Sequence, residues 1–452
     1  NSRAVYGSGT LMPETTKRVI MSAYNLITSK PLTSERPLTE EIKGKGFLII
    51  LRRVCGPKAM ELFFSCQPVG LPMDAGKQAK AMYCAIRDIL VSEGGGVESI
   101  VSETIFMRDM ENDIEAVRSV RQNVLAASSD NSVECALTEI QQPPLDESAS
   151  LEISIQAILS NVSAIQKQQV HAKSGCPCSE CTDSQGICIQ IEGEGRLLAG
   201  GLCGAGKDAS EQTHSMFELA EKLLHEAGME FSDVVRTWIY LREMERDYGH
   251  LNQARREFFE SRGIKPVPAS TGIEGGMVSD KHDLCLGIYA VKAGEPPLRT
   301  VMTSPTLNEA GEYGADFVRG MKMVETNKVA LHVSGTASID EAGRTAHVDD
   351  FEAQVDRMIV NISTLLENQG AHFGDIVSAF SYLKDPANEK RLKEKFKQAG
   401  FEGFPNTFVK AEVCRPDLLC ETEVFAVLPR VQASANDHEQ RHLREAKPVA
   451  LE

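Results

Sequence analysis

The stretch FEAQVDRMIVNISTLLENQGAHFGDIVSAFSYLKD, residues 351–385, decides the fold of this chain. Its first half places Met358, Ile362 and Leu365 on one face of a helix, because apolar residues recur there at three- and four-residue spacing. Gly370 is expected to end that helix in a left-handed cap. The second half is an apolar, partly alternating run that stops at an acidic residue, which is typical of a strand. The stretch therefore predicts a helix followed by a strand.

The same pattern occurs three times in the 452 residues. Residues 77–109 and 210–243 repeat the helix, the terminal glycine and the acidic end of the strand. A strand precedes each copy, and a second helix and a closing strand follow it. The second helices are expected at residues 114–124, 248–259 and 389–398. We therefore predict three tandem units, each a mixed sheet with two helices on one face, which is an α+β architecture.

The predicted boundaries follow the polar stretches between these units. We assign residues 1–44 to an N-terminal extension, 45–160 to the first unit, 161–186 to a cysteine-rich linker or loop, 187–294 to the second unit, 295–430 to the third unit, and 431–452 to a disordered tail.

Composition narrows the class of function. The formal net charge is -16 and the isoelectric point is near 5.2, so we expect neither nucleic-acid binding nor attachment to anionic membranes. Apolar runs are too short for a transmembrane helix, and the first residues lack the basic patch and apolar core of a secretory signal. The twelve cysteines lie mostly among apolar neighbours, as reduced thiols do, so a cytoplasmic location is expected.

All three units, from about residue 45 to about residue 430, resemble the Rid/YjgF superfamily. The likeness lies in the order of the elements, in the helix beginning near Gln354, and in the closing strand with Glu421 and Glu423 in an E-x-E pattern. Members of that superfamily are usually single domains that form trimers, with ligand sites in the clefts between subunits. The resemblance implies an intramolecular pseudo-trimer, present as a monomer or as a low-order oligomer of such pseudo-trimers.

A closer resemblance covers the second and third units, which are similar to the chorismatases. It rests on RTWIYLREMERDYGHLNQARREFFESRGI from Arg236, EAGEYGADFVRG from Glu309, VSGTASID from Val333 and AEVCRPDLLCETE from Ala411. Chorismatases are an offshoot of the superfamily that hydrolyse the enol ether of chorismate. The resemblance implies a cofactor-free hydrolase or lyase that releases pyruvate from a small carboxylate-bearing metabolite.

The sequence also departs from the superfamily pattern. A typical Rid imine deaminase carries an arginine in a P-A-R context early in its penultimate strand, where it clamps a substrate carboxylate. Here the corresponding triplets are ALT at 136–138, PAS at 268–270 and PNT at 405–407, so simple imino-acid deamination is not expected. At the position of Glu421, the first unit has Glu152 and the second has Cys285. The three clefts therefore differ, and we expect one working site, lined by the third unit.

Protonation of an enol ether needs an acid that keeps its proton near neutral pH. Glu421 is our candidate, because its strand is apolar and Glu423 lies on the same face, where a second carboxylate would raise the pKa of the first. The alternative is an exposed pair on an edge strand. Arg319 and Arg415 are the candidate clamps for substrate carboxylates. The alternative for each is a surface salt bridge.

Five further residues complete the predicted site. Tyr313 and Phe317 would stack against the substrate ring or close the pocket, although core packing fits them equally well. Ser334 and Gly335 would let backbone N–H groups approach a ligand, or they mark only a β-bulge. Cys414 would line the cavity and control how the intermediate is captured; the alternative is a plain buried thiol.

A cysteine-rich loop carries the only metal motif that we recognise. Cys176, Cys178, Cys181 and Cys188 have C-x-C-x2-C-x6-C spacing, which suits a structural zinc ion with four thiolate ligands. The alternative is a loop of reduced thiols. Three functions therefore stay open: a chorismatase-like enzyme, a divergent Rid-type imine or enamine hydrolase, and a non-catalytic protein that binds a small ligand.

Overall fold

The computed structural model describes residues 37–126, 133–160, 165–176, 183–292, 299–313 and 316–430. The first unit contains β1 (Leu38–Gly44), β2 (Phe47–Cys55), β3 (Ala59–Pro68), α2 (Ala75–Ser92), β4 (Ile100–Met107), α3 (Met110–Leu125), β5 (Ala136–Gln141) and β6 (Leu151–Ser160). The second contains β7 (Gln166–Lys173), β8 (Asp183–Ile191), β9 (Glu194–Leu202), α4 (Ala209–Glu226), β10 (Val234–Leu241), α5 (Met244–Arg262), β11 (Ala269–Glu274) and β12 (Leu284–Lys292). The third contains β13 (Arg299–Met302), β14 (Gly320–Val324), β15 (Val329–Thr336), α6 (Phe351–Glu367), β16 (Ile376–Leu383), α7 (Glu389–Ala399), β17 (Asn406–Lys410) and β18 (Cys420–Leu428).

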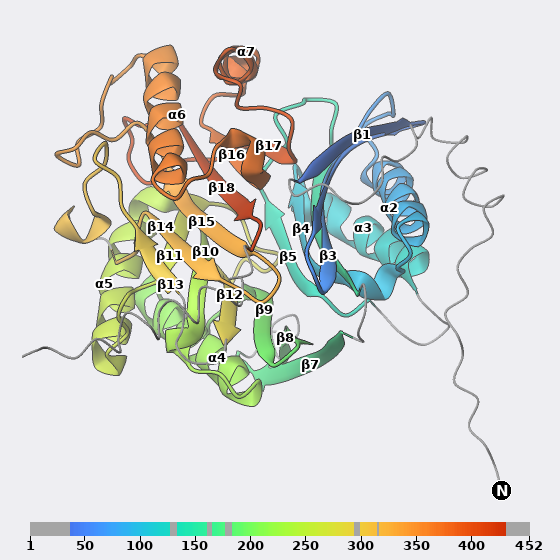
Figure 1. Cartoon of the computed structure of the whole chain (residues 1–452), viewed down its shortest axis with the longest axis horizontal. Coiled ribbons are helices and arrows are strands. Elements are labelled where there is room, and N and C mark those ends of the chain that lie inside the picture. The colour runs from blue at the N-terminus through green and yellow to red at the C-terminus, as the bar shows by residue number, and fades with distance from the viewer. Residues whose placement is uncertain are drawn as a thin grey trace, which may run out of the picture.

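All three units have the same sheet topology (Figure 1). The strand orders are β1-β2-β3-β6-β4-β5, β7-β8-β9-β12-β10-β11 and β13-β14-β15-β18-β16-β17. In each sheet one neighbouring pair is parallel, β4 with β5, β10 with β11 and β16 with β17, whereas the pairs around it are antiparallel. This repeated mixed topology confirms the predicted series of three tandem α+β units.

The helices lie where the sequence predicts, although α3 and α5 each begin four residues earlier than expected. An aspartate at the start of the first helix in each unit accepts a hydrogen bond from a backbone N–H in the first turn, at 2.9–3.1 Å. These aspartates are Asp74, Asp208 and Asp350. The glycines that follow the helices have positive φ angles, 90° at Gly94, 70° at Gly228 and 77° at Gly370.

The sequence-based boundaries are wrong at the start of the first and second units. Strand β1 lies inside the predicted N-terminal extension, and β7 with the first residues of β8 lies inside the predicted linker at 161–186. Both strands are polar, because each has one face in solvent and few buried side chains, such as Ile42 in β1 and Val170 in β7. Their composition therefore resembles that of a loop. The tail at 431–452 lies outside the described residues.

The three units contact one another in a closed ring (Figure 1). Strand β5 of the first unit contacts β9 of the second, β11 of the second contacts β15 of the third, and β17 of the third contacts β3 of the first. The same two strand positions meet at every interface. Backbone hydrogen bonds join the units, for example Gln141 N–H to Gly276 O at 2.8 Å. These are the contacts that the expected pseudo-trimer requires.

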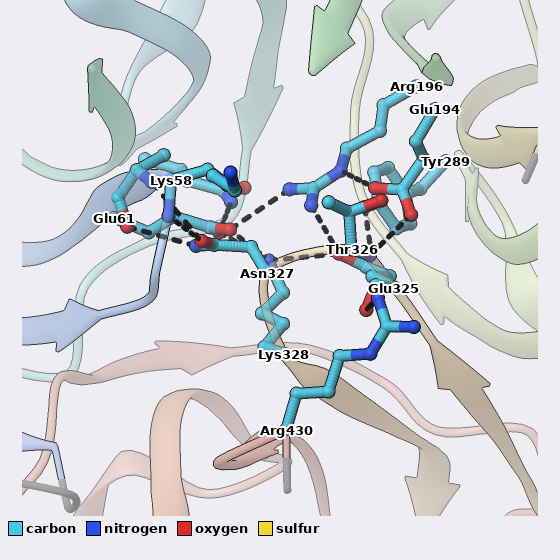
Figure 2. Close-up of polar contacts among 12 residues, drawn as sticks. Lys58, Glu61, Glu194, Arg196, Tyr289, Glu325, Thr326, Asn327, Lys328 and Arg430 are labelled. Atoms are coloured by element: carbon cyan, nitrogen blue, oxygen red, sulfur yellow. Dashed lines mark hydrogen bonds and ion pairs between the residues drawn. The ribbon is translucent and has the colours of Figure 1, made fainter. Parts of the chain in front are cut away.

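A cluster of buried charged residues from all three units also joins the ring (Figure 2). Arg196 of β9 forms ion pairs with Glu61 of the first unit and Glu325 of the third, each at 2.9 Å, and with Glu194 at 2.7 Å. Lys328 contacts both Glu61 and Glu325. Although burial raises it, the pKa of Glu61 is lowered to about 2 by the charges of Lys328 and Arg196. The buried Glu61 carboxylate of the first unit is thus compensated by cations of the other two units.

Candidate functional site

The predicted site residues meet in a pocket between the second and third units. The third unit supplies Phe317, Arg319, Gly335, Ala337, Ile339, Cys414, Arg415, Leu418 and Glu421, and the second supplies Tyr248, Arg255, Ser270 and Gly272. Six of these residues were predicted from sequence. The free volume is about 30 Å³, which is room for little more than a water molecule. A larger ligand therefore requires side chains at the mouth, such as the partly exposed Arg415, to move.

Glu421 lies on β18, opposite Tyr382 of β16, and only 5% of its surface is exposed. Burial raises the pKa of its carboxyl to about 8, and the charge of Glu423 adds to the effect, whereas Arg236 and Arg319 oppose it. The carboxyl fits against Gly335: a Cβ at that position would lie 1.9 Å from Glu421 Oε1. The chain register shifts between Val333 and Thr336, so the small residues there also form an irregularity in the strand.

Two arginines of the third unit are held by backbone carbonyls. Arg319 is 4% exposed; its Nε and Nη2 donate to the carbonyl and side-chain oxygens of Asn308 at 2.8 and 3.0 Å. Its guanidinium lies 5.6 Å from the centre of the Phe317 ring. Arg415 Nη1 donates to Gly343 O at 2.8 Å. These contacts fix both cations at the pocket beside Glu421.

The second unit contributes Tyr248 and Arg255, which the sequence-based prediction missed. Both lie on α5, seven residues apart and thus on one helical face. Arg255 is 2% exposed, lies 5.8 Å from the centre of the Phe317 ring, and donates through Nη1 to Ser270 Oγ at 3.5 Å. The signal was present in the sequence, because Arg255 lies between Leu251 and the phenylalanines at 258–259 on the apolar face of the helix. A charged residue there indicates a function or a buried partner.

The other predicted residues take different positions. Ser334 is buried between the units: its Oγ accepts from Ser270 N at 2.9 Å and donates to Val318 O at 2.6 Å. Glu423 lies on the same face of β18 as Glu421 but does not line the pocket; it accepts hydrogen bonds from Arg236 at 2.9 Å and Trp238 at 2.6 Å. The side chain of Tyr313 lies outside the described residues.

Cys414 lines the pocket beside Glu421. Burial and the neighbouring Glu421 raise the pKa of its thiol to about 12, while a hydrogen bond with Tyr248 lowers it. A thiol with this pKa keeps its proton at neutral pH. It contributes shape to the wall of the pocket.

The equivalent positions in the other clefts carry different chemistry. Strand pairing aligns Glu152, Cys285 and Glu421, which lie opposite Phe106, Tyr240 and Tyr382 respectively. In the cleft between the first and second units the acid is therefore replaced by a thiol. In the cleft between the third and first units, burial raises the pKa of Glu152 to about 8, with Lys393 opposing the effect.

Of the four predicted zinc ligands, Cys176 and Cys188 lie among the described residues, in different surroundings. Cys188 pairs with Leu197 inside the sheet and packs in the core of the second unit. Cys176 instead lies 3.6 Å from His282 Nε2, and His282 Nδ1 contacts Gly204 O at 3.1 Å. Cys178 and Cys181 lie outside the described residues, and within the described ranges no three metal-binding side chains gather.

Comparisons with known proteins agree with these features. The family model for Endoribonuclease L-PSP matches residues 196–291 and 314–428. A RutC family protein of Saccharolobus solfataricus is 35% identical over 98 residues, 21% of this chain and 77% of that protein. One of Pyrococcus abyssi is 33% identical over 98 residues, 76% of that protein. A crystal structure of chorismatase has a TM-score of 0.53 and 15% identity over 73% of this chain and 93% of that chain, which shows a shared fold. Within the described residues, no helix has the length and apolar character to span a membrane.

Proposed function

Since the chain belongs to the RutC family, within the Rid/YjgF superfamily, we propose that the pocket between its second and third units is the active site of a small-molecule hydrolase or lyase. The specific reaction that we propose is cleavage of the enolpyruvyl ether of chorismate, with release of pyruvate. The observation that carries the proposal is a buried carboxyl with a pKa of about 8, Glu421, in a pocket that three arginines line.

The acid step fits the state of Glu421. With a pKa of about 8, roughly nine-tenths of the carboxyls keep their proton at pH 7. The proton is delivered to the terminal methylene carbon of the enol ether, and the ether carbon becomes an oxocarbenium ion. Water adds to that carbon and gives a hemiketal. The hemiketal O–H proton passes to the ring oxygen as the bond between the ether carbon and that oxygen breaks, which releases pyruvate and leaves a hydroxyl on the ring. The Glu421 carboxylate then regains a proton from the added nucleophile.

The arginines supply the charge that a dicarboxylate needs. Arg319, Arg415 and Arg255 approach the pocket from two units, so each of two carboxylates can receive charge-assisted hydrogen bonds. Phe317 lies between two of these guanidinium groups and offers an apolar surface for a ring. Binding of this kind would place the enol ether beside Glu421.

One observation favours the second candidate, a Rid-type imine or enamine hydrolase. Ser270 stands where a typical Rid imine deaminase has its carboxylate-binding arginine, and Arg255 of α5 hydrogen-bonds to that serine. Arg255 could therefore supply the missing cation from another element. Such an enzyme would bind a carboxylate in the same pocket without cleaving chorismate.

The test is pyruvate release from chorismate by the purified chain, coupled to lactate dehydrogenase. Glu421→Gln should lose activity, whereas Glu152→Gln, which changes a carboxyl of equal pKa at the equivalent position, should retain it. Absence of pyruvate from a folded protein would exclude chorismate cleavage. Turnover of a 2-imino acid, measured as an increased rate of ammonia release, would then support the second candidate.

A further inference from the structure

A second cavity lies at the centre of the ring, where the sheets of all three units face one another. Its volume is about 120 Å³, comparable to the cavity of roughly 150 Å³ that binds benzene in an engineered core. The walls are mostly apolar, and residues of every unit contribute to them. This cavity and the pocket of the proposed active site share no lining residue: Glu423 lines the cavity, and Glu421 lines the pocket.

The strand register shows that equivalent positions of the three units line this cavity. Ser102, Arg236 and Ser378 lie opposite equivalent partners on the closing strands of their units. All three line the cavity. An assembly of identical subunits would have the same residue three times at this level. Here the second unit supplies an arginine and the other two units supply serines. The three sides of the cavity therefore differ in chemistry.

The same asymmetry recurs one level along the strands, where the equivalent residues are Thr104, Trp238 and Phe380. Trp238 is the only tryptophan of the chain. Its indole N–H donates to Glu423 at 2.6 Å, and the Arg236 guanidinium lies 5.2 Å from the centre of its ring. A single aromatic side chain with fixed partners thus forms one wall.

A third set consists of Phe63, Leu198 and His332, of which only the histidine is polar. His332 stacks on Phe425 with ring centres 4.5 Å apart and is 5% exposed. Burial, and then the charges of Arg236 and Lys328, lower its pKa well below the usual value, so the ring is neutral.

Two residues that line the cavity each have a buried side-chain nitrogen with no hydrogen-bond partner among the described residues. The two nitrogens are Arg236 Nη1 and His332 Nε2. Less than 1 Å² of either nitrogen is accessible, so a ligand bonds to them only after the side chains turn toward the cavity. Arg236 meets its charge requirement through Nη2, which pairs with Glu423 Oε2 at 2.9 Å. The guanidinium therefore needs a hydrogen-bond acceptor at Nη1 but no further anion. A neutral His332 in its Nε2–H form needs the same kind of partner.

We propose that the central cavity is a binding site for a small, uncharged, largely apolar molecule with one hydrogen-bond acceptor, such as a carbonyl oxygen. The acceptor lies toward Arg236 Nη1 and His332 Nε2, and the apolar part packs against the aromatic walls. Charge complementarity excludes a carboxylate as the preferred ligand, because Arg236 is already paired with Glu423.

Fluorescence of Trp238 measures occupancy directly in the full chain, since no other tryptophan contributes. The probes are cyclopentanone, cyclopentane and sodium acetate, each corrected for collisional quenching with free tryptophan. Cyclopentanone should change the emission saturably, and cyclopentane should bind roughly fivefold more weakly because it makes no hydrogen bond. Neither measurement depends on turnover, so its outcome is independent of the proposed enzyme activity.

Two substitutions at His332 distinguish the effect of the cavity's volume on ligand binding from the effect of hydrogen bonding. His332→Leu and His332→Phe install the residues that the second and first units carry at the same position, so both suit the fold. The leucine variant should weaken cyclopentanone but not cyclopentane, and the phenylalanine variant should weaken both. Equal binding of ketone and hydrocarbon, preference for acetate, or no saturable signal with any probe would each overturn the proposal; the last result would mean a cavity that holds only water.

Discussion

Replacing Glu421 by glutamine should stabilise the chain while removing its activity. The folded-state pKa of about 8 lies above the ordinary value of 4.5, so the folded chain holds this proton more tightly than the unfolded chain does. The free energy of unfolding of the parent therefore falls as pH rises from 4.5 to about 8. A neutral glutamine at the same position does not titrate, so the free energy of unfolding of the variant does not fall in this way as pH rises.

The magnitude follows from the two pKa values. At about 1.4 kcal/mol per pH unit, the burial of Glu421 weakens folding by roughly 3 kcal/mol at pH 7 and roughly 5 kcal/mol at pH 9. At pH 5 the loss is below about 1 kcal/mol, because this pH lies only about half a unit above the pKa of the carboxyl in the unfolded chain. The stabilisation by Glu421→Gln should therefore grow with pH over this interval.

Urea unfolding at pH 5, 7 and 9 measures this dependence, and Glu152→Gln is the matched control. Burial raises the pKa of Glu152 to about 8 as well, so both variants should gain stability with rising pH. Only Glu421→Gln should lose pyruvate release. The reasoning fails if Glu421→Gln unfolds at lower urea than the parent at pH 9, or if its advantage is the same at every pH.

Three further expectations can be measured on the same protein. Activity of the parent should fall about tenfold between pH 7 and pH 9 as Glu421 loses its proton, whereas a flat profile would argue against this acid. Gly335→Ala should abolish activity with intact folding by circular dichroism, because the added Cβ would lie 1.9 Å from the Glu421 carboxyl; an active variant would show that the carboxyl has room to move. Lys328→Met should destabilise the chain by roughly 3–5 kcal/mol in urea, since it leaves Arg196 as the one remaining partner cation of both Glu61 and Glu325 among the described residues, and an unchanged midpoint would contradict that role.

The fold was largely predictable because its signals are local. Helix periodicity, terminal glycines and apolar strands recur three times, and each repetition supports the others. The edge strands β1 and β7 were missed because a strand with one solvent face needs few apolar residues, and their alternation is short. Their assignment depends on pairing with a neighbour, which is not a local property.

Of the residues that line the site, only residues of the third unit were predicted from the sequence. Glu421, Arg319 and Arg415 come from one unit and stand out as charged residues among apolar neighbours or in long motifs. Arg255 comes from the second unit, and its role depends on how the two units meet, which no local pattern encodes. Cys188 was assigned to the cysteine loop by spacing alone, whereas its side chain follows the alternation of β8 into the core.

The three interfaces of the ring use the same strand positions. The order of the units along the chain therefore depends only on which units the connecting segments join. The interface between the third and first units uses the same two strand positions as the two interfaces between consecutive units. Short connections join Ser160 to β7 and Lys292 to β13. A connection of similar length from Leu428 to Leu38 would close the circle, and the chain could then be opened at either existing connection. A circular permutant that begins at β7 or at β13 should therefore fold into the same ring with the same three clefts.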